Sequence, residues 1–512
     1  MHDDLQQAGL QQIGVTVSEL MATSGVPFGT SGVRGLASAM KDKLCHAYAT
    51  AFLQYLRQIG EFADGGRVAI AGDLRESTPR IIAACATAVR DCGGEVVYCG
   101  MVPTPALALY AMSGKGGGKA MPSIMVTGSH IPADRNGIKF YRPHGEVLKS
   151  DEAGIVSQRV AIDPAQFGND DSLLAPVALP EVVDVVPAYI ERYVRHFGAD
   201  ALSGLTIGVY QHTAVGRDVL VQAVEALGAK AVPFGRETVF VPVDTEAIRA
   251  EDIALAAEWA AANKVDAIIS TDGDSDRPLV SDAQGVWLRG DVVGLLCARS
   301  VGADVAVTPV SSNTVLELSG AVPKVVRTRI GSPYVIAAMM DAAKADPAAC
   351  VCGYEANGGF LLGTDVGDLA ALPTRDAFLP IVAVVQAARE RPIADVVAEL
   401  PPRFTFSDRV ADFPQAHSAA LIALLSSGAQ DEQLARIARL FGEIAGLPTG
   451  IDTTDGYRMS FADGAVIHFR PSGNAPELRC YTEAESEAKA RDLNARALSH
   501  VVADVVPEAV RV

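Results

Sequence analysis

Residues 123–141 read SIMVTGSHIPADRNGIKFY, which is an apolar run, a polar turn and a second apolar run. The run at 123–126 predicts a buried strand, and 137–141 predicts a second, short one. The residues between them are rich in Pro, Asp, Asn and Gly, which predicts a loop. Ser129 and His130 therefore lie on a loop at the end of a strand, where α/β enzymes keep reactive groups. An ordinary polar turn is the alternative, and the rest of the chain decides between the two.

The composition excludes several classes of protein. A chain of 512 residues with 49% hydrophobic and 20% charged residues is typical of a globular enzyme with roughly three or four domains. The net charge of −18 argues against a nucleic-acid partner, because such proteins need a basic face. No uncharged apolar run of about 18 residues occurs, so we expect no membrane partner. The eight cysteines form no Cys-x-x-Cys pair and the N-terminus has no secretory pattern, which predicts free thiols and a cytoplasmic location.

One plan of secondary structure recurs along the chain. A predicted strand at 67–71, helix at 78–91 and strand at 95–98 form a βαβ unit, which requires a parallel sheet. Strands and helices alternate in the same way over 205–270 and again over 290–352. In each of these blocks, a polar loop follows the last strand. We therefore predict an α/β protein with three successive mixed α/β domains of similar plan, which indicates internal triplication.

The last part of the chain has a different character. It follows a linker at Pro401-Pro402, and Asp463-Gly464 between two short apolar runs predicts a hairpin, so we expect a C-terminal α+β domain. Residues 1–25 show little pattern and predict a loosely held extension. The glycines and small hydroxyl residues around Arg34 at 28–35 predict an exposed loop, and the Pro- and Asp-bearing stretch at about 160–190 predicts a connector. The predicted domains, with the active site in the central cleft, are 1–160, 180–285, 286–398 and 403–512.

Three carboxylates alternate in the loop after the predicted strand at 265–270. Asp272, Asp274 and Asp276 would repel one another unless a cation binds, and hard oxygen ligands favour Mg²⁺ or Ca²⁺. An EF-hand is excluded, because Arg277 stands where its glycine is required and the loop follows a strand. A solvated acidic turn is the alternative.

A phosphate would join this metal loop to the Ser129 loop. Mg²⁺ keeps coordination positions open for phosphate oxygens, and a phosphate on Ser129 would supply one. The metal would then neutralise charge during phosphoryl transfer. Glu355 and Asn357, in a glycine-rich loop, can exchange hydrogen bonds with hydroxyl groups. Cationic and backbone donors for a second phosphate come from Arg470, Ser472, Gly473, Asn474 and Arg479.

Together these loops resemble the α-D-phosphohexomutase family, which includes phosphomannomutases, phosphoglucomutases and phosphohexosamine mutases. The resemblance extends over 28–479 in the family's order. FGTSGVRG at 28–35, TGSHIP at 127–132 and NGIK at 136–139 correspond to the family's F-G-T-[SD]-G-[VI]-R-G, T-A-S-H-N-P and N-G-x-K. DGDSDR at 272–277, GYEANG at 353–358 and RPSGNAPELR at 470–479 correspond to its metal loop D-G-D-x-D-R, sugar loop G-E-x-S-G and phosphate loop R-x-S-G-T-E-P-x-x-R.

The resemblance implies a mechanism and a role for each loop. Phosphorylated Ser129 would donate its phosphoryl group to a hexose monophosphate, and the resulting hexose 1,6-bisphosphate would turn round and return the other phosphoryl group. Ser129 and the three aspartates would bind Mg²⁺. The transferring group would be surrounded by Arg34, His130, Lys139 and Arg277, and a lysine or a histidine would move the hydroxyl proton. Glu355 and Asn357 would bind sugar hydroxyls, and the donors within 470–479 would hold the non-reacting phosphate.

Departures from the family motifs bear on the substrate. Asn357 replaces the usual serine of the sugar loop, and Gly128 and Ile131 alter the phosphoserine turn. The motif TGSHIP favours a phosphomannomutase, with a phosphoglucomutase or a dual enzyme as the alternatives. A phosphohexosamine mutase or a metal-dependent sugar-phosphate phosphatase ranks behind these. A phosphatase needs only one phosphate site, so the second loop at 470–479 disfavours it.

A protein that only binds sugar phosphates or senses divalent ions is the remaining alternative. It would not explain why a serine lies where a phosphate could join it to a metal. The resemblance therefore implies a hexose monophosphate as partner and a hexose 1,6-bisphosphate as cofactor, together with the Mg²⁺ that the aspartates predict. A monomer and a homodimer both remain open.

Overall fold

The computed structural model describes residues 14–29, 32–114, 118–472 and 476–511. The chain divides into two compact units. Unit 1 contains the chain up to Ala306 together with Gly331–Val396, and unit 2 contains Val307–Ile330 and Val397–Val512. Sheets with helices packed on them occur in both units, which confirms the predicted α/β class.

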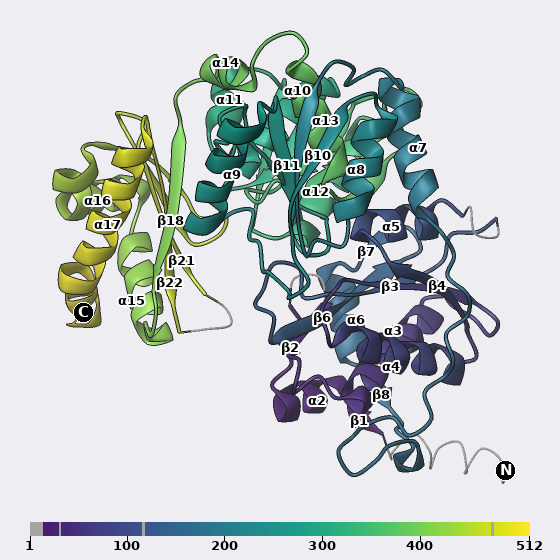
Figure 1. Cartoon of the computed structure of the whole chain (residues 1–512). Helices are drawn as coiled ribbons and strands as arrows, with labels where there is room; N and C mark the ends of the chain where they lie inside the picture. Colours follow the sequence, from purple (N-terminus) through teal and green to yellow (C-terminus); the bar gives the residue numbers. More distant parts are fainter. Residues whose placement is uncertain (1–13, 30–31, 115–117, 473–475, 512) are drawn as a thin grey trace. The chain divides into compact units, whose positions relative to one another are not determined.

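The first sheet of unit 1 carries the Ser129 loop. Its strand order is β2-β6-β5-β3-β4, with β7 paired to β6. β3 pairs in parallel with β4 and β5, whereas β5 and β6 are antiparallel. Helices α3 and α4 lie on one face of the sheet and α5 lies on the other (Figure 1). The elements are β2 (Gly32–Leu36), α3 (Asp42–Gln58), β3 (Arg67–Gly72), α4 (Thr78–Asp91), β4 (Glu95–Met101), α5 (Thr104–Met112), β5 (Ser123–Val126), β6 (Arg135–Arg142), β7 (Gly145–Glu146) and α6 (Lys149–Val156).

The βαβ unit predicted at 67–98 is present, and its limits follow from the sequence. α4 begins at Thr78 with a proline in its first turn, and it ends just before Gly93, whose φ of 73° suits the end of a helix. All four residues of β5 are buried, because helices cover both faces of the sheet. Phe52 of α3 stacks on Phe140 of β6 with ring centroids 4.7 Å apart. This packing fixes β6, the strand that also carries Lys139.

Two predictions for the N-terminal part were wrong. In the described part of the expected loose extension, β1 (Val15–Thr16) and α2 (Val17–Ser24) form, and a capping box at Thr16 starts α2. β1 pairs with β8 (Arg159–Val160). The segment expected as an exposed loop around Arg34 is β2, because it pairs with β6. Both pairings join segments that are distant in the sequence, so local pattern could not reveal them.

The second sheet of unit 1 carries the metal loop. Its order is β10-β9-β11-β12, in which β9 is parallel to both neighbours and β12 is antiparallel to β11. The metal loop connects β11 to β12. The segment predicted as a connector at 160–190 contains a short helix and the start of α7. The elements are η1 (Pro164–Gln166), α7 (Val186–Phe197), β9 (Thr206–His212), α8 (Arg217–Ala226), β10 (Lys230–Arg236), α9 (Ala250–Asn263), β11 (Ala267–Thr271) and β12 (Pro278–Val280).

The third part of unit 1 carries the sugar loop. β15, β16 and β17 are successive antiparallel neighbours, and the loop at 355–359 connects β15 to β16. β16 and β17 were not predicted, because three- to five-residue runs give too little alternation. The elements are α10 (Gly290–Ser300), α12 (Ser332–Ala345), β15 (Val351–Tyr354), β16 (Phe360–Leu362), β17 (Leu372–Asp376) and α13 (Phe378–Ala387). The three boundaries between the units fall within β13 (Val305–Pro309), between Ile330 and Gly331, and within α14 (Ile393–Ala398).

Unit 2 contains an antiparallel sheet in the order β18-β22-β21-β20-β19. The hairpin predicted from Asp463-Gly464 joins β20 to β21, and Gly464 has a φ of 83°. Helices pack on the sheet around Phe441 and Tyr457, which confirms the α+β character of this part. The elements are α11 (Val315–Ser319), β14 (Lys324–Thr328), β18 (Phe404–Val410), α15 (Gln415–Ser426), α16 (Gln430–Ala445), β19 (Pro448–Asp452), β20 (Tyr457–Phe461), β21 (Val466–Pro471), β22 (Leu478–Ala484), α17 (Glu487–His500), η2 (Val501–Val505) and α18 (Val506–Arg511).

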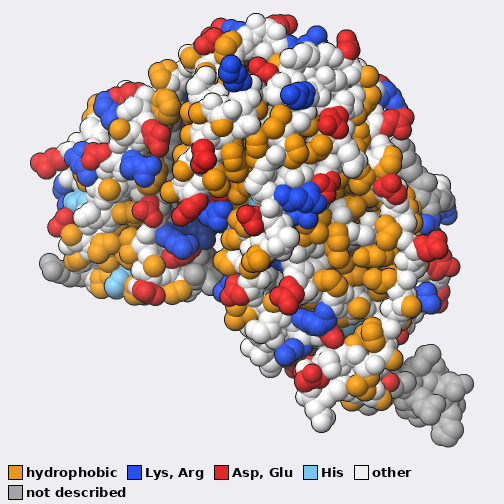
Figure 2. Space-filling model, viewed as in Figure 1, with side chains coloured by type: hydrophobic (Ala, Val, Ile, Leu, Met, Phe, Trp, Pro, Cys, Tyr) orange, Lys and Arg blue, Asp and Glu red, His pale blue; other side chains and the backbone are white. Residues whose placement is uncertain are grey.

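The surface and the thiols can be compared with what the composition predicted. Figure 2 shows basic and acidic side chains interspersed on the face that is visible. All eight cysteines are free, as predicted. In the described part of the chain, no helix has both the length and the apolar character needed to cross a membrane. The absence of a nucleic-acid partner and the cytoplasmic location stay predictions.

Candidate active site

Ser129 lies on a tight turn after β5 and is fully buried. Its φ of 54° is in the left-handed region, which non-glycine residues seldom adopt and which is often found at functional sites. The backbone N–H of Ser129 donates to Oγ1 of Thr127 at 2.7 Å, and Thr127 donates to Asp73 at 2.7 Å. Ser129 Oγ donates to Oδ2 of Asp272 at 2.5 Å. The serine hydroxyl is therefore held against the metal loop.

Arg75 holds this turn in place. Its guanidinium donates to four backbone carbonyls of the Ser129 turn, at 2.6 to 2.9 Å, and forms an ion pair with Asp73 at 3.1 Å. The ring of Phe240 covers the guanidinium, with its centroid 4.0 Å from Cζ. A Cβ atom at Gly128 would lie 2.6 Å from that Cζ. The glycine that replaces the family's alanine therefore makes room for Arg75.

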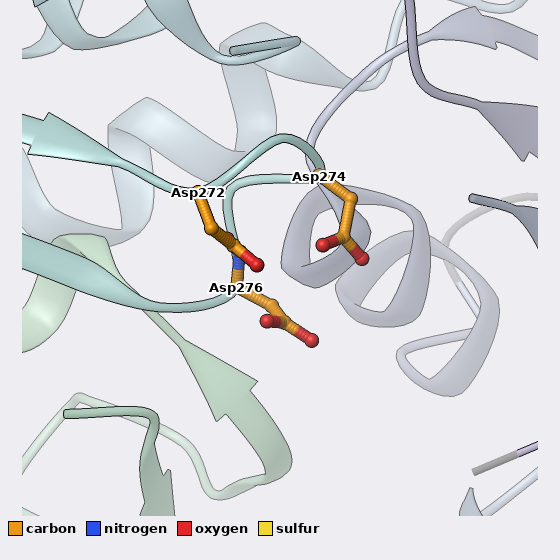
Figure 3. Close-up of side chains that lie close together, drawn as sticks. All are labelled: Asp272, Asp274 and Asp276. Carbon is orange, nitrogen blue, oxygen red and sulfur yellow. The ribbon is translucent and has the colours of Figure 1, made fainter. Parts of the chain in front are cut away.

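The three aspartates of the metal loop converge (Figure 3). One oxygen from each lies within 4.8 Å of the others, and all three side chains are buried. Oδ1 of Asp272 accepts the backbone N–H groups of Asp276 and Arg277, both at 3.2 Å, which closes the turn. A Cβ atom at Gly273 would lie 2.6 Å from the carbonyl oxygen of Ser129, so this glycine allows the two loops to approach. The structure thus brings Ser129 and the aspartates together.

Neighbouring cations set the ionisation of these carboxyl groups. Nζ of Lys139 donates to Asp274 at 2.6 Å and to Asp276 at 2.5 Å. Burial opposes ionisation, but Lys139 lowers the pKa of Asp274, and Arg375 together with Lys139 lowers the pKa of Asp276. Burial and the two neighbouring carboxylates raise the pKa of Asp272 well above its usual range. The three carboxylates repel one another, and a bound divalent cation would stabilise their ionised forms.

The donor set fits a hard divalent cation. Oδ1 of Asp274 and Oδ1 of Asp276 are buried and have no hydrogen-bond partner among the described residues. A buried oxygen without a partner costs free energy, and Mg²⁺ would supply that partner. Ser129 and the three aspartates provide only oxygen ligands, which is the preference of Mg²⁺.

Cationic and imidazole groups lie beside the Ser129 turn. Nη1 of Arg277 donates to Nδ1 of His130 at 2.9 Å, and Ser129 Oγ lies 3.4 Å from the same nitrogen. Burial and the charges of Arg277 and Arg34 hold the pKa of His130 far below its usual value, so the ring is neutral. Burial and two neighbouring guanidinium groups lower the pKa of Arg34 to about 10, which leaves it charged at neutral pH.

Glu355 and Asn357 are buried in the tight loop between β15 and β16. Oδ1 of Asn357 accepts the N–H of Gly359 at 2.9 Å, and the N–H of Glu355 donates to the carbonyl of Gly359 at 3.2 Å. Thr245 donates from Oγ1 to the carbonyl oxygen of Asn357 at 2.7 Å. The sugar loop is therefore anchored to the segment that precedes α9.

The phosphate loop predicted at 470–479 belongs to unit 2. Gly473 and Asn474 lie outside the described residues. Ser472 is buried, and its N–H donates to the carbonyl oxygen of Glu477 at 3.0 Å, which brings the two ends of the loop together.

The two arginines of this loop face each other across β21 and β22. Arg470 and Arg479 are register partners, so they lie on one face of the sheet, and Arg409 of β18 is the next partner in the row. Arg470 donates to Asp455 at 3.0 Å, and Arg479 donates to one oxygen of Glu477 at 2.7 and 2.9 Å. A row of arginines on one face provides the donors that a phosphate requires.

Three residues of the unit 1 site were missed by sequence reasoning: Arg75, Thr104 and Arg375. Thr104, at the start of α5, donates to Oδ2 of Asp274 at 2.6 Å. Arg375, on β17, contacts both the metal loop and the sugar loop. A signal existed only for Arg75, because Asp73-x-Arg75 follows a buried strand as the other functional loops do. The other two are brought to the site by the fold alone.

Models of the four domains of the phosphoglucomutase/phosphomannomutase family match the chain in order. The alpha/beta/alpha domains I, II and III match residues 25–165, 187–285 and 289–404, and the C-terminal domain matches 423–499. The chain belongs to the phosphoglucomutase/phosphomannomutase family. The predicted resemblance is confirmed, and with it the isomerase class of a phosphohexomutase.

Individual relatives cover nearly the whole chain. A phosphomannomutase of Sinorhizobium fredii is 44% identical over 481 residues, which are 93% of this chain and 98% of that protein. A phosphomannomutase of Salmonella muenchen is 41% identical and covers 94% of this chain and 97% of its own. Among solved structures, the N-acetylphosphoglucosamine mutase of Aspergillus fumigatus in complex with GlcNAc-6P and magnesium shares the fold, with a TM-score of 0.58 at 15% identity over 95% of this chain and 99% of that chain.

Proposed function

We propose that the protein is a Mg²⁺-dependent phosphomannomutase, which interconverts mannose 1-phosphate and mannose 6-phosphate through a phosphorylated Ser129. The observation that carries the proposal is the 2.5 Å contact of Ser129 Oγ with Asp272 at a buried cluster of three aspartates. A phosphoryl group on this oxygen would lie against a metal held by Asp272, Asp274 and Asp276. Similarity to two phosphomannomutases over nearly the whole chain supports mannose as the sugar.

The chemical step is the exchange of one P–O bond for another. A sugar hydroxyl attacks the phosphorus of phosphorylated Ser129, the bond from phosphorus to Oγ breaks, and the hydroxyl proton passes to a base. Bound Mg²⁺ would neutralise charge on the phosphoryl oxygens. Lys139 and Arg277 are buried beside the aspartates, where their charges act more strongly than they would in water. Arg34 adds a third positive charge.

The proton of the attacking hydroxyl has two candidate acceptors, Lys139 and His130. The neutral ring of His130 accepts a hydrogen bond from Arg277 at Nδ1, which leaves the proton of the ring on Nε2. His130 is therefore suited to donate to a ligand oxygen and poorly suited to act as a base. Lys139, which reaches the site from β6, is the remaining candidate, and it would have to pass one of its own protons to Asp274 or Asp276, to which it donates, before it could accept another.

The sugar and its second phosphate would contact the two remaining loops. Oδ1 of Asn357 is already engaged by Gly359, so its side-chain NH₂ group would donate to a hydroxyl, and Glu355 would accept. Asn357 can thus replace the family's serine as a donor. The non-reacting phosphate would be held by Arg470, Ser472, Gly473, Asn474 and Arg479.

A mutase also requires an intermediate with phosphate at both ends. We propose hexose 1,6-bisphosphate in this role, and a trace of it as activator. The Aspergillus fumigatus structure, which contains a sugar 6-phosphate and magnesium, supports a hexose monophosphate and Mg²⁺ as the ligands of this site. We further propose a cytoplasmic enzyme that acts as a monomer or homodimer.

Product analysis tests the proposal. Purified protein is incubated with mannose 1-phosphate or glucose 1-phosphate, Mg²⁺ and a trace of the matching 1,6-bisphosphate, and compared with Ser129→Ala and with the exposed-serine control Ser157→Ala. We expect the 6-phosphate from the wild type and the control, faster from mannose 1-phosphate, and none from Ser129→Ala. Inorganic phosphate as the main product would instead indicate a phosphatase, and faster turnover of glucose 1-phosphate would indicate a phosphoglucomutase.

A further inference from the structure

Arg375 joins the metal loop to the sugar loop. From β17, its Nε donates to Oδ2 of Asp276 at 3.0 Å, and its Nη1 donates to Oε2 of Glu355 at 3.3 Å. The Arg375 side chain is 4% exposed, and its two partners are 0% and 8% exposed. One buried guanidinium therefore holds a carboxylate proposed to bind metal and a carboxylate proposed to bind sugar.

The neighbours of Arg375 fix the strand from which it projects. Oγ1 of Thr374 donates to Glu146 of β7 at 2.8 Å, and Asp376 accepts the hydroxyl of Tyr189 of α7 at 2.6 Å. Alternate residues of a strand point to opposite faces, so these two anchors lie on one face and Arg375 lies on the other. A Cβ atom at Gly359 would lie 2.6 Å from Cδ of Arg375, so the sugar loop packs directly on its stem. The guanidinium has little freedom to move.

One nitrogen of the guanidinium is still available. Nη2 of Arg375 is buried and has no hydrogen-bond partner among the described residues. Buried donors are nearly always satisfied in folded proteins, so such a nitrogen indicates that a ligand or a water completes the site.

We propose that Arg375 is a positioning residue which orients the metal ligand Asp276 and the sugar-binding residue Glu355 at the same time, and so couples the metal site to the sugar site. The inference rests on the proposed function. Its physical basis is the shape of guanidinium, which presents several N–H groups in a rigid plane, whereas an ammonium is a point charge. Residues that hydrogen-bond to a metal ligand hold it in the correct orientation, and their loss typically costs about 10- to 100-fold in metal affinity.

The substitution Arg375→Lys separates positioning from charge. Binding of Mn²⁺ to the full-length protein is measured by electron paramagnetic resonance, and binding of mannose 6-phosphate is measured by calorimetry. We expect the Kd of Mn²⁺ to rise about tenfold and the Kd of the sugar phosphate to rise as well, although the charge is retained. If Arg375 acted through charge alone, both constants would stay near the wild-type values, and that result would overturn the proposal.

Arg142→Lys is the matched control. Arg142 also joins two carboxylates, donating to Glu61 at 2.9 Å and to Asp151 at 3.1 Å, but it lies at the far end of β6 from the metal loop. We expect this variant to lower the melting temperature without changing either Kd. Equal effects of the two substitutions on Mn²⁺ binding would show a general loss of structure and would also overturn the proposal.

Two further variants keep the test decisive. Gly359→Ala leaves the chemistry of Arg375 intact but displaces its stem, so we expect the same loss of Mn²⁺ affinity. Glu355→Gln weakens one of the two contacts of Arg375. Adding Arg375→Lys to this variant should therefore raise the Kd of the sugar phosphate little further. Additive effects of the two substitutions on this Kd would contradict the proposal that they act together. Because the Mn²⁺ readout does not depend on turnover, a failure of the proposed mutase activity would be seen separately.

Discussion

The cluster of charged residues in unit 1 and the phosphate loop in unit 2 are built differently. In unit 1, Lys139 and Asp276 are almost completely buried, and each contacts residues from another sheet. In unit 2, the side chains of Arg470 and Arg479 are 22% and 40% exposed and pair with carboxylates of their own unit. The groups proposed to react are thus held in advance by contacts between sheets, whereas the arginines of unit 2 are partly exposed and would have to exchange a carboxylate for the phosphate that we propose they bind. We therefore expect the first region to govern the chemical step and the second to govern binding.

Because the unit 1 cluster is buried, substitutions in it should be costly in free energy. Removing one member of a buried charged network leaves its partners unpaired, which costs far more than losing an exposed ion pair. Asp276, for example, accepts hydrogen bonds from both Lys139 and Arg375, and its Oδ1 lies 3.8 Å from Nε of Arg277. Substitutions in this cluster should thus have larger effects than equivalent ones in unit 2.

The largest expected effect is that of Asp276→Asn on the chemical step. The substitution removes a negative charge and a proposed metal ligand from the cluster while preserving shape. We expect kcat to fall about 10³-fold, with a raised Mg²⁺ requirement and a small change in KM, because the lost interaction acts mainly in the transition state. Steady-state kinetics over a Mg²⁺ series would check this. A kcat within a factor of about ten of the wild type would remove Asp276 from the proposed metal site.

The next largest effect concerns the acid stability of unit 2. Burial lowers the pKa of His468 to about 4, and this ring contacts the carbonyl of Asp455 at 2.5 Å. The unfolded chain takes up the proton near pH 6.5, before the folded one does, so stability is complete above pH 6.5 and falls as the pH drops towards 4. The loss should reach about 3 kcal/mol at pH 4.

Urea unfolding at several pH values measures this term. Trp259 and Trp287, the two tryptophans, both lie in unit 1, so their fluorescence follows that unit and circular dichroism follows both. The part of the dichroism transition that is absent from the fluorescence signal reports the unfolding of unit 2. His468→Gln should make the unfolding free energy obtained from that part depend less on pH. An unchanged slope would show that the pKa of His468 is the same in the folded and the unfolded chain.

A pair of glycine substitutions contrasts the packing of the two units. Gly128→Ala places a Cβ atom 2.6 Å from the pinned guanidinium of Arg75, and we expect a loss of about 2 kcal/mol of unfolding free energy through overpacking. Gly442→Ala, inside α16, meets no atom within 4 Å, so it should stabilise unit 2 by about 0.5 to 1 kcal/mol. Urea denaturation gives both values. Stabilisation by Gly128→Ala would mean that Arg75 moves freely and does not fix the Ser129 turn.

The smallest expected effect is that of Arg479→Ala on binding. Arg479 is part-exposed, so the loss of its proposed contact with a phosphate should raise KM about tenfold and leave kcat nearly unchanged. Arg491→Ala, an exposed arginine paired with Glu487 on α17, is the control and should change neither constant. A fall in kcat as large as that of Asp276→Asn would end the distinction between the two regions.

The sequence predicted the parts of the molecule that are encoded locally. The strand at 123–126, the helix at 78–91 and the Asp-Gly hairpin follow from patterns within a few residues, and the structure confirms each. The alternating aspartates marked the metal loop because three carboxylates after a buried strand need a partner. Family motifs then supplied the order of the loops and the class of enzyme.

The parts that depend on distant contacts could not be predicted. β2 is rich in glycine and resembles a loop until it pairs with β6. β16 and β17 are too short for their pattern to show, and no local pattern marked Arg375 as part of a site. Its role depends on the side-by-side placement of β17, the metal loop and the sugar loop, which only the tertiary structure displays.

The transfer of phosphate through Ser129 is the central claim, and it can be measured directly. The protein is incubated with mannose 1,6-bisphosphate carrying labelled phosphate, separated from it, analysed by peptide mass spectrometry and then chased with unlabelled mannose 6-phosphate. The account predicts one phosphate on Ser129, which leaves the protein in the chase and appears on the sugar. Label on another residue, label that the sugar cannot remove, or release of the label as inorganic phosphate would contradict it.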